Sequence, residues 1–304
     1  MEDEYYSESI LIPTNDKSGD ILWLEHNPPL SQVRKNASKW NGYYLLLIHG
    51  MEGSTESHYM VSAGKEALNR GYGVVRMNLR NCGRGLGLAR KPYNAGQSED
   101  IETVLQYIYK HFTKSIFVSG FSLSANMVVK FFGEKRQHYA KGFSATSPPL
   151  DLKRSCDFID SRAGNFYRDH FLDTMKEKVT SGIYDIPDKI KERVLRSKSF
   201  FDFDDFFTAP IAGYTNVLEY YNICSGLKYL GGIKIPGLLV HADDDPVVPS
   251  EVWHEIRWNS FPLLQTVLTE KGGHVGFISD TSPDNPEGRW LPRILLDFFD
   301  SQIK

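Results

Sequence analysis

Residues 115–126 place the strongest constraint on the fold of this chain, and they read Ser-Ile-Phe-Val-Ser-Gly-Phe-Ser-Leu-Ser-Ala-Asn. The β-branched and aromatic run at 116–118 favours a strand, whereas the residues from Leu123 to Phe132 favour a helix. A sharp strand-to-helix turn lifts the hydroxyl of its central serine above the end of a sheet and needs small neighbours, because strand and helix pass close together. The stretch predicts a nucleophile elbow centred on Ser122, with Ser124 in the place of the usual second glycine.

The elbow pentapeptide by itself is weak evidence, because Gly-X-Ser-X-small matches arise by chance. Its alternative is a serine in an ordinary strand-to-helix turn. The surrounding pattern favours the elbow, since apolar strands alternate with amphipathic helices along much of the chain. We expect strands at 10–13, 21–25, 43–49, 72–79, 115–120, 142–147, 235–241 and 263–269, and helices at 57–70, 97–109, 123–132, 252–258 and 289–299.

This alternation predicts an α/β fold with a mostly parallel sheet of about eight strands, flanked by helices, and with the first two strands as an antiparallel edge. The alternation stops at 151–232, where the sequence is charged, aromatic and broadly helical in pattern. We therefore predict a core made of residues 1–150 and 233–304, with a cap or lid inserted at 151–232.

The composition excludes several classes of protein. A formal charge of −3, with 35 basic and 38 acidic residues interspersed, leaves no basic stripe for nucleic acid. Three well-separated cysteines suggest neither a disulfide framework nor a zinc site. The sequence has neither a signal-peptide pattern nor an apolar run of membrane-spanning length, so we expect a cytoplasmic protein without a cofactor, for which peripheral membrane contact stays open.

A serine nucleophile needs a base and a group that orients the base. An elbow of this kind is followed along the chain by the acid and then by the histidine. Of the five histidines after Ser122, His274 is the one in a suitable position, in the glycine-rich segment 271–276 that follows a predicted strand. The other four come too early in the chain, or in one case lie within a predicted helix.

The acid should follow the strand at 235–241, where the sequence reads Ala-Asp-Asp-Asp-Pro-Val-Val-Pro. We select Asp245, because the two prolines stiffen the exit of its loop, and expect Asp243 and Asp244 to brace that loop. Three adjacent carboxylates also occur in metal sites, yet no second ligand cluster accompanies them. Asp151 is the alternative acid.

An oxyanion site needs backbone donors near the nucleophile. The amide of Leu123 is one candidate, and the amide of Met51 in the segment 49–53, His-Gly-Met-Glu-Gly, is the other. We expect His49 to brace this segment. The glycine-rich stretch 80–87 lacks the spacing of a nucleotide loop and is interpreted as structural, and its Cys82 has no evident base.

Taken together, these motifs resemble the α/β-hydrolase superfamily and, more narrowly, the YheT-like hydrolases and their eukaryotic relatives. The matching stretches follow one order along most of the chain: His49-Gly-Met-Glu-Gly53, Arg80-Asn-Cys-Gly83, Tyr93-Asn-Ala-Gly-Gln-Ser-Glu-Asp100, Gly120-Phe-Ser-Leu-Ser-Ala-Asn126, Ser147-Pro-Pro-Leu-Asp-Leu152, Phe207-Thr-Ala-Pro210 and Ala242-Asp-Asp-Asp-Pro246. The sequence departs from the family pattern at Ser124 and at Asn81, where a glycine is usual. The resemblance implies a serine carboxylesterase, lipase or acyltransferase type of activity with Ser122, Asp245 and His274 as the triad.

The expected reaction is attack of Ser122 on an ester, with a medium-chain acyl ester or a lipid as the substrate class. Aromatic residues of the cap are candidates for an acyl pocket, although such residues more often form a cap's own core: Phe166, Tyr167, Phe206 and Phe207. Three alternatives stay open. They are an acyltransferase with the same triad, a peptidase, and a catalytically silent hydrolase fold that binds a ligand.

Overall fold

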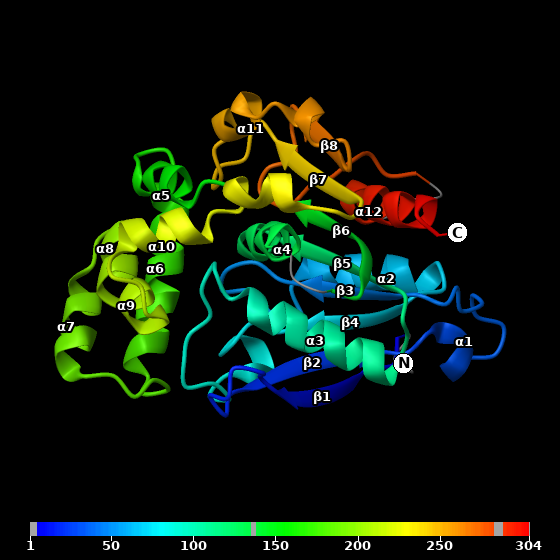
Figure 1. Cartoon of the computed structure of the whole chain (residues 1–304), viewed down its shortest axis with the longest axis horizontal. Coiled ribbons are helices and arrows are strands. Elements are labelled where there is room, and N and C mark those ends of the chain that lie inside the picture. Colours follow the sequence, from blue (N-terminus) through cyan, green and yellow to red (C-terminus); the bar gives the residue numbers. More distant parts are fainter. Residues whose placement is uncertain (1–4, 135–137, 283–287, 304) are drawn as a thin grey trace.

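An eight-stranded sheet forms the centre of the computed structural model, which describes residues 5–134, 138–282 and 288–303 (Figure 1). Its strands are β1 (Glu8–Pro13), β2 (Ile21–Asn27), β3 (Tyr44–Ile48), β4 (Gly73–Met77), β5 (Ile116–Phe121), β6 (Ala140–Thr146), β7 (Gly237–Ala242) and β8 (Leu264–Thr269). Their order in the sheet is β1-β2-β4-β3-β5-β6-β7-β8, and only the β1–β2 and β2–β4 pairs are antiparallel. The predicted fold class, with its antiparallel edge, is confirmed.

Helices cover both faces of this sheet (Figure 1). On one face lie α3 (Ser98–His111) and α4 (Leu123–Gly133), and on the other α2 (His58–Asn69) packs beside α12 (Trp290–Ser301). The core strands β3 and β5 are buried along their whole length, which explains their continuous apolar sequence. Short helical segments complete this part of the chain: α1 (Leu30–Val33), η1 (Gly83–Gly85), α11 (Glu251–Glu255) and η4 (Trp258–Ser260).

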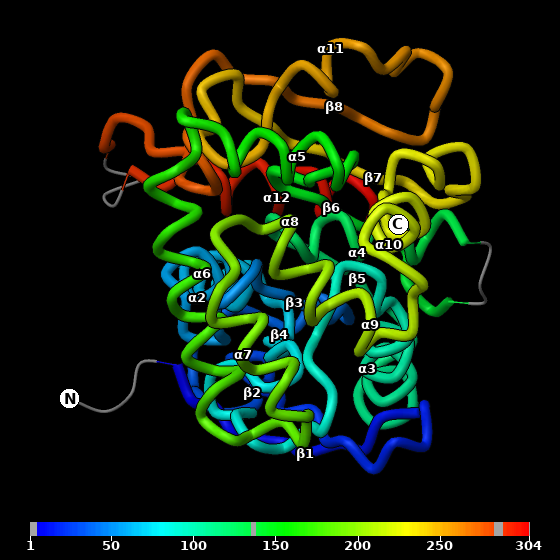
Figure 2. Tube along the Cα trace, turned by 90° about the vertical axis from the view of Figure 1, so that its left-hand side faces the viewer, coloured from blue at the N-terminus to red at the C-terminus, as the bar shows by residue number. Residues whose placement is uncertain are grey.

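The segment between β6 and β7, which we call the cap, is helical and lies over one end of the sheet (Figure 2). Its elements are α5 (Leu152–Asp160), α6 (Asn165–Thr180), α7 (Asp188–Arg196), α8 (Phe200–Phe203), the π-helical turn η2 (Asp204–Thr208), α9 (Ala209–Ala212), α10 (Val217–Cys224) and η3 (Gly226–Gly232). The cap has a hydrophobic cluster of its own, separate from the clusters on the two faces of the sheet. Among the described residues, no helix is long and apolar enough to span a bilayer.

The parallel register brings four loops to the same edge of the sheet. Ile48 at the end of β3 pairs with Gly120 in β5, and Ala242 at the end of β7 pairs with Thr269 at the end of β8. The chain therefore leaves β3, β5, β7 and β8 at one edge, beneath the cap. In open α/β sheets, ligands bind outside the carboxyl ends of the strands.

Candidate active site

Ser122 occupies a strained turn between β5 and α4. Its backbone has φ 55° and ψ −121°, in a region that a residue with a side chain rarely adopts. A Cβ on Gly120 would lie 2.6 Å from the carbonyl oxygen of Ser124, so this position requires glycine. Strand and helix pass as closely as an elbow demands.

Ser124, in the place of the second glycine, is accommodated by its own hydrogen bonds. Its side chain is buried, and Oγ accepts from the backbone N–H of Phe121 at 2.9 Å. The same hydroxyl donates to the carbonyl oxygen of Ile48 at 2.5 Å, which connects the elbow to the end of β3. A small hydroxyl residue thus replaces glycine while strengthening the turn.

The structure brings Ser122, His274 and Asp245 into one hydrogen-bonded series. Asp245 Oδ2 and Oδ1 lie 2.9 and 3.0 Å from His274 Nδ1, and His274 Nε2 lies 2.8 Å from Ser122 Oγ. Because the carboxylate accepts a hydrogen bond from Nδ1–H, Nε2 keeps its lone pair for the serine hydroxyl. These residues are separated by up to 152 positions in the sequence.

Backbone hydrogen bonds hold the Asp245 carboxylate in place. Its side chain is fully buried, and Oδ1 accepts from the backbone N–H groups of Val247 and Val248 at 2.9 and 3.0 Å. The alternative acid, Asp151, instead caps α5 by accepting from the N–H of Arg154.

The two aspartates before Asp245 point elsewhere. Asp243 lies 2.8 Å from His254 Nε2, and Asp244 accepts from the N–H groups of Gly272 and Gly273 at 2.8 Å each. Asp244 therefore holds the loop that carries His274. Within residues 5–134, 138–282 and 288–303, no group of three or more His, Cys, Asp and Glu side chains is placed to hold a metal ion.

The loop after β3 lies directly against the elbow. A Cβ on Gly50 would lie 2.9 Å from Ser122 Cβ, so only glycine permits this approach. Met51 and Leu123, which supply the predicted oxyanion donors, line the same cavity as Ser122.

The imidazole ring of His49 braces this loop through two hydrogen bonds. Its Nδ1 donates to the carbonyl of Gly50 at 2.6 Å, and its Nε2 accepts from the N–H of Leu79 at 3.0 Å. Burial lowers the pKa of His49 to about 4, so the ring is neutral and keeps this pair of hydrogen bonds.

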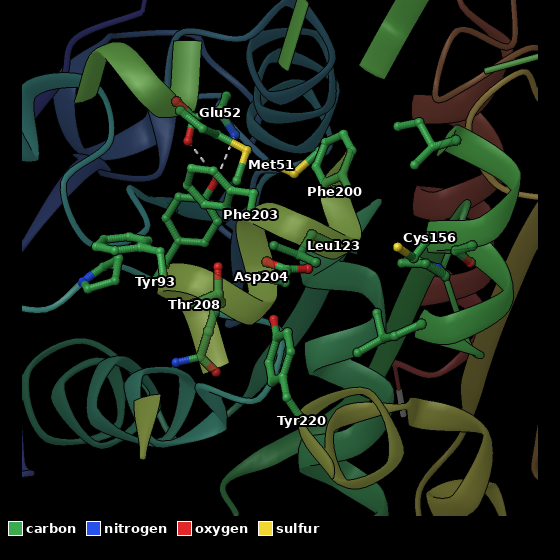
Figure 3. Close-up of a pocket in the computed structure, with 18 of the residues that line it drawn as sticks. Met51, Glu52, Tyr93, Leu123, Cys156, Phe200, Phe203, Asp204, Thr208 and Tyr220 are labelled. Atoms are coloured by element: carbon green, nitrogen blue, oxygen red, sulfur yellow. Dashed lines mark hydrogen bonds between the residues drawn. The ribbon is translucent and has the colours of Figure 1, made fainter. Parts of the chain in front are cut away.

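Glu52, Tyr93 and Lys178 form a cluster that the sequence did not predict. This cluster holds the same loop on the side of the cap. Glu52, next to Met51, has a positive φ of 54°. Its carboxylate accepts from Tyr93 Oη at 2.6 Å and pairs with Lys178 of α6 at 2.7 Å (Figure 3). The Glu52 and Lys178 side chains are only 8% and 14% exposed, so the pair connects the cap to the loop in a largely buried place.

His241 was excluded as the base because it precedes the candidate acids, and its place beside Asp245 was not predicted. It is buried in β7, with Nδ1 3.8 Å from Asp245 Oδ2 and its ring stacked on Trp253. Burial lowers the pKa of His241, so it is a neutral neighbour of the Asp245 carboxylate.

The cavity above Ser122 has a volume of about 930 Å³, counted with its open mouth, and its lining is mostly apolar. Phe207 lines it together with Phe200 and Phe203. The prediction needs correction for the three other aromatic residues, which are not among the lining residues: Phe166, Tyr167 and Phe206. Phe166 is 78% exposed, Tyr167 packs against the cap's own cluster, and Phe206 stacks under the Arg193 guanidinium at 4.2 Å.

The segment 80–87 is structural. Asn81 adopts φ 56°, which asparagine tolerates better than most residues, and its side chain binds the backbone of Gly87 and Ala89. These contacts accommodate an asparagine where the family resemblance implies a glycine. Cys82 is buried, and burial raises the pKa of its thiol to about 12, so it stays protonated.

The fold and the site define an α/β-hydrolase, and the chain belongs to the alpha/beta hydrolase fold family, whose model matches residues 43–281. The resemblance to YheT-like hydrolases is confirmed: YheT of Escherichia coli is 28% identical over 91% of this chain and 79% of its own length. Two Saccharomyces cerevisiae proteins each match 84% of the chain. They are a monoacylglycerol lipase at 29% identity and the medium-chain fatty acid ethyl ester synthase/esterase 2 at 26%. The chain spans only 59% and 61% of these two yeast proteins.

Solved structures share the fold at low sequence identity. The Pyrococcus furiosus esterase Pf2001 aligns with a TM-score of 0.63 and 17% identity, covering 99% of this chain and 94% of that one. Est1E from Butyrivibrio proteoclasticus aligns with a TM-score of 0.60 and 16% identity, covering 97% and 98%.

Proposed function

We propose that this protein is a carboxylic ester hydrolase in which Ser122 is the nucleophile, His274 the general base and Asp245 the residue that orients His274. The observation that carries the proposal is the hydrogen bond of 2.8 Å between Ser122 Oγ, on its strained turn, and His274 Nε2. Support also comes from the yeast relatives, one named a lipase and one a synthase/esterase.

In the proposed reaction, Ser122 Oγ attacks the ester carbonyl as its proton moves to His274 Nε2. The N–H groups of Met51 and Leu123 stabilise the oxyanion of the tetrahedral intermediate. The intermediate collapses to an acyl-enzyme, and His274 returns the proton to the departing alcohol. Water then attacks the acyl-enzyme with His274 as base, which releases the acid and restores Ser122.

The mostly apolar cavity supports an acyl ester of medium chain length or a lipid as substrate. Each CH₂ group that the cavity buries contributes about 0.8 kcal/mol, which corresponds to about a fourfold gain in kcat/KM. The rate should therefore rise with chain length until the cavity is full.

An acyltransferase is the second candidate, because a relative named a fatty acid ethyl ester synthase/esterase matches 84% of the chain. The same acyl-enzyme would then be intercepted by an alcohol in place of water. A catalytically silent fold is the third candidate. It predicts that a fluorophosphonate probe leaves Ser122 unlabelled.

The test measures kcat/KM for p-nitrophenyl esters of graded chain length with wild type and Ser122→Ala. We expect Ser122→Ala to lower kcat by a factor on the order of 10⁶ and to abolish fluorophosphonate labelling, because the nucleophile is lost. Ser260→Ala, an exposed serine in η4, is the matched control and should keep full activity. Equal activity in wild type and Ser122→Ala would refute the proposal, and product analysis with added ethanol separates hydrolysis from acyl transfer.

A further inference from the structure

One carboxyl group in the cavity above Ser122 has no neutralising partner among residues 5–134, 138–282 and 288–303. Two acidic side chains line this cavity, Glu52 and Asp204. Glu52 is paired with Lys178, whereas Asp204 forms no ion pair with any residue that the structure describes. A carboxyl group in a mostly apolar cavity is costly unless something donates to it.

Asp204 begins the π-helical turn η2, where the cap faces the elbow. Single π-helical turns occur often at functional sites. Figure 3 shows Asp204 among the side chains that surround the cavity, with Leu123, Phe203 and Tyr220 around it. Asp204 lies within the cap and is half-buried, and it borders the cavity.

The neighbours of the Asp204 carboxyl are hydroxyl groups. Tyr221 Oη donates to Oδ2 at 2.7 Å, and the Thr208 side chain also hydrogen-bonds to the carboxyl. An ionised carboxylate offers about four acceptor positions, so these two donors leave capacity on the group. Burial raises the pKa of Asp204 to about 6, and the nearby Asp160 adds to the shift. A further donor would therefore stabilise the ionised form.

Charge alone does not decide which ligand Asp204 binds, because the ammonium group of Lys178 in the cavity wall is balanced by Glu52 at 2.7 Å. The donors that Asp204 already accepts from are the hydroxyl groups of Tyr221 and Thr208. A substrate hydroxyl matches these donors, and a cation is the competing ligand that the experiment tests.

We propose that Asp204 determines substrate specificity by accepting a hydrogen bond from a free hydroxyl group of the substrate. The preferred substrates are then esters that carry a hydroxyl on the acyl or the alcohol portion. This inference rests on the proposed function, because it takes the cavity above Ser122 as the place where the ester binds.

The experiment compares matched esters with and without a hydroxyl group. Glycerol monooctanoate against propyl octanoate tests the alcohol side, and methyl 8-hydroxyoctanoate against methyl octanoate tests the acyl side. Choline octanoate tests for a cation site. The variants are Asp204→Leu, the isosteric Asp204→Asn, and Asp205→Asn as a control in the same π-helical turn that does not line the cavity.

We expect wild type to prefer the hydroxylated ester in one of the two arms, and that arm identifies the side that carries the hydroxyl. Asp204→Leu should lower the ratio of kcat/KM between hydroxylated and plain ester by about 10- to 100-fold, as for a lost charge-assisted hydrogen bond. Asp205→Asn should leave the ratio unchanged. Asp204→Asn, which keeps one carbonyl acceptor, should lie between.

An unchanged ratio in Asp204→Leu would overturn the inference, as would an equal loss on both esters, which indicates a structural role. A choline-ester preference that disappears in Asp204→Leu would show a cation site instead. Binding of 1-O-octylglycerol against octyl propyl ether to Ser122→Ala provides a readout that needs no hydrolysis. Loss of all hydrolysis by wild type would count against the proposed function, whereas a failed ratio with intact hydrolysis counts only against the role of Asp204.

Discussion

At the scale of single residues, the site depends on side chains whose ionisation is shifted by burial. His49 is kept neutral beside the loop after β3, and its two ring nitrogens need different roles, one donating and one accepting. Asp204 shows the opposite case, since burial favours its protonated form. The lowered pKa of His49 reduces folding stability at low pH, and the raised pKa of Asp204 reduces it at high pH. Such pKa shifts are common at functional sites.

The raised pKa of Asp204 predicts how stability depends on pH. The unfolded carboxyl has a pKa of 3.8 and the folded one about 6, so proton uptake stabilises the folded state at low pH. This stabilisation is lost as pH rises through about 6. The groups that face Asp204 are Tyr221 and Tyr220 of α10 and Cys156 and Asp160 of α5, all within the cap.

We therefore expect the stability gained in Asp204→Asn to be larger at pH 8 than at pH 5, by about 1.4 kcal/mol for the one pH unit below 6. The measurement is the free energy of unfolding in urea at both pH values, for wild type and variant. Asp205→Asn, in the same π-helical turn, is the control. A gain that is the same at both pH values would contradict the shift.

At the scale of elements, the loop after β3 is where the cap and the core meet. Gly50 N–H donates to Tyr59 Oη of α2 at 3.0 Å, which holds the loop from the core. Lys178 of α6 holds it from the cap through Glu52. Any displacement of α6 would therefore also shift the adjacent N–H group of Met51.

We expect Lys178→Met to lower kcat by about 10-fold, less than the 10²–10³ that follows complete loss of one oxyanion donor, because the loop keeps its core contacts. The double variant Lys178→Met with Glu52→Gln should recover part of this loss, since the buried carboxylate is removed with its partner. Lys176→Met is the matched control, because Lys176 of the same helix binds the carbonyl of Ser197 within the cap. Equal kcat in the two single variants would contradict a role for Lys178 in positioning the loop.

At the scale of the whole molecule, a buried ion cluster connects the turn between β1 and β2 to helix α3. Arg80 is 1% exposed and binds Asp16 and Asp20 of the β1–β2 turn at 2.9 and 2.8 Å. It also binds Asp100, in the first turn of α3, at 2.6 Å. The antiparallel edge is thereby attached to a core helix.

Arg80→Met should lower the free energy of unfolding by about 3–5 kcal/mol, because two buried carboxylates lose their cation. Urea unfolding measures the effect. Arg84→Met is the comparison, since the Arg84 side chain is 60% exposed and exposed ion pairs contribute about 0–1 kcal/mol. Similar losses in the two variants would show that the cluster adds little to stability.

Local sequence pattern predicted the elements well. The helix expected at 57–70 is α2 (His58–Asn69), and the strand expected at 263–269 is β8 (Leu264–Thr269). The helix expected at 252–258 ends early, at Glu255. There the chain turns extended, and Trp258 packs on Trp253 with ring centroids 4.6 Å apart. Tertiary packing outweighed helix propensity at that point.

By itself, the sequence determined the alternating fold and the elbow at Ser122, because periodicity and glycine placement act within a few residues. It also limited the base and the acid to few candidates, since chain order restricts which loops follow the elbow. Only the tertiary structure decided which aromatic residues line the cavity, that Lys178 reaches Glu52, and that Asp204 faces the cavity without a counter-ion in the described part of the chain. These contacts join segments up to 126 residues apart, and no local pattern encodes which side of a cap helix turns inward.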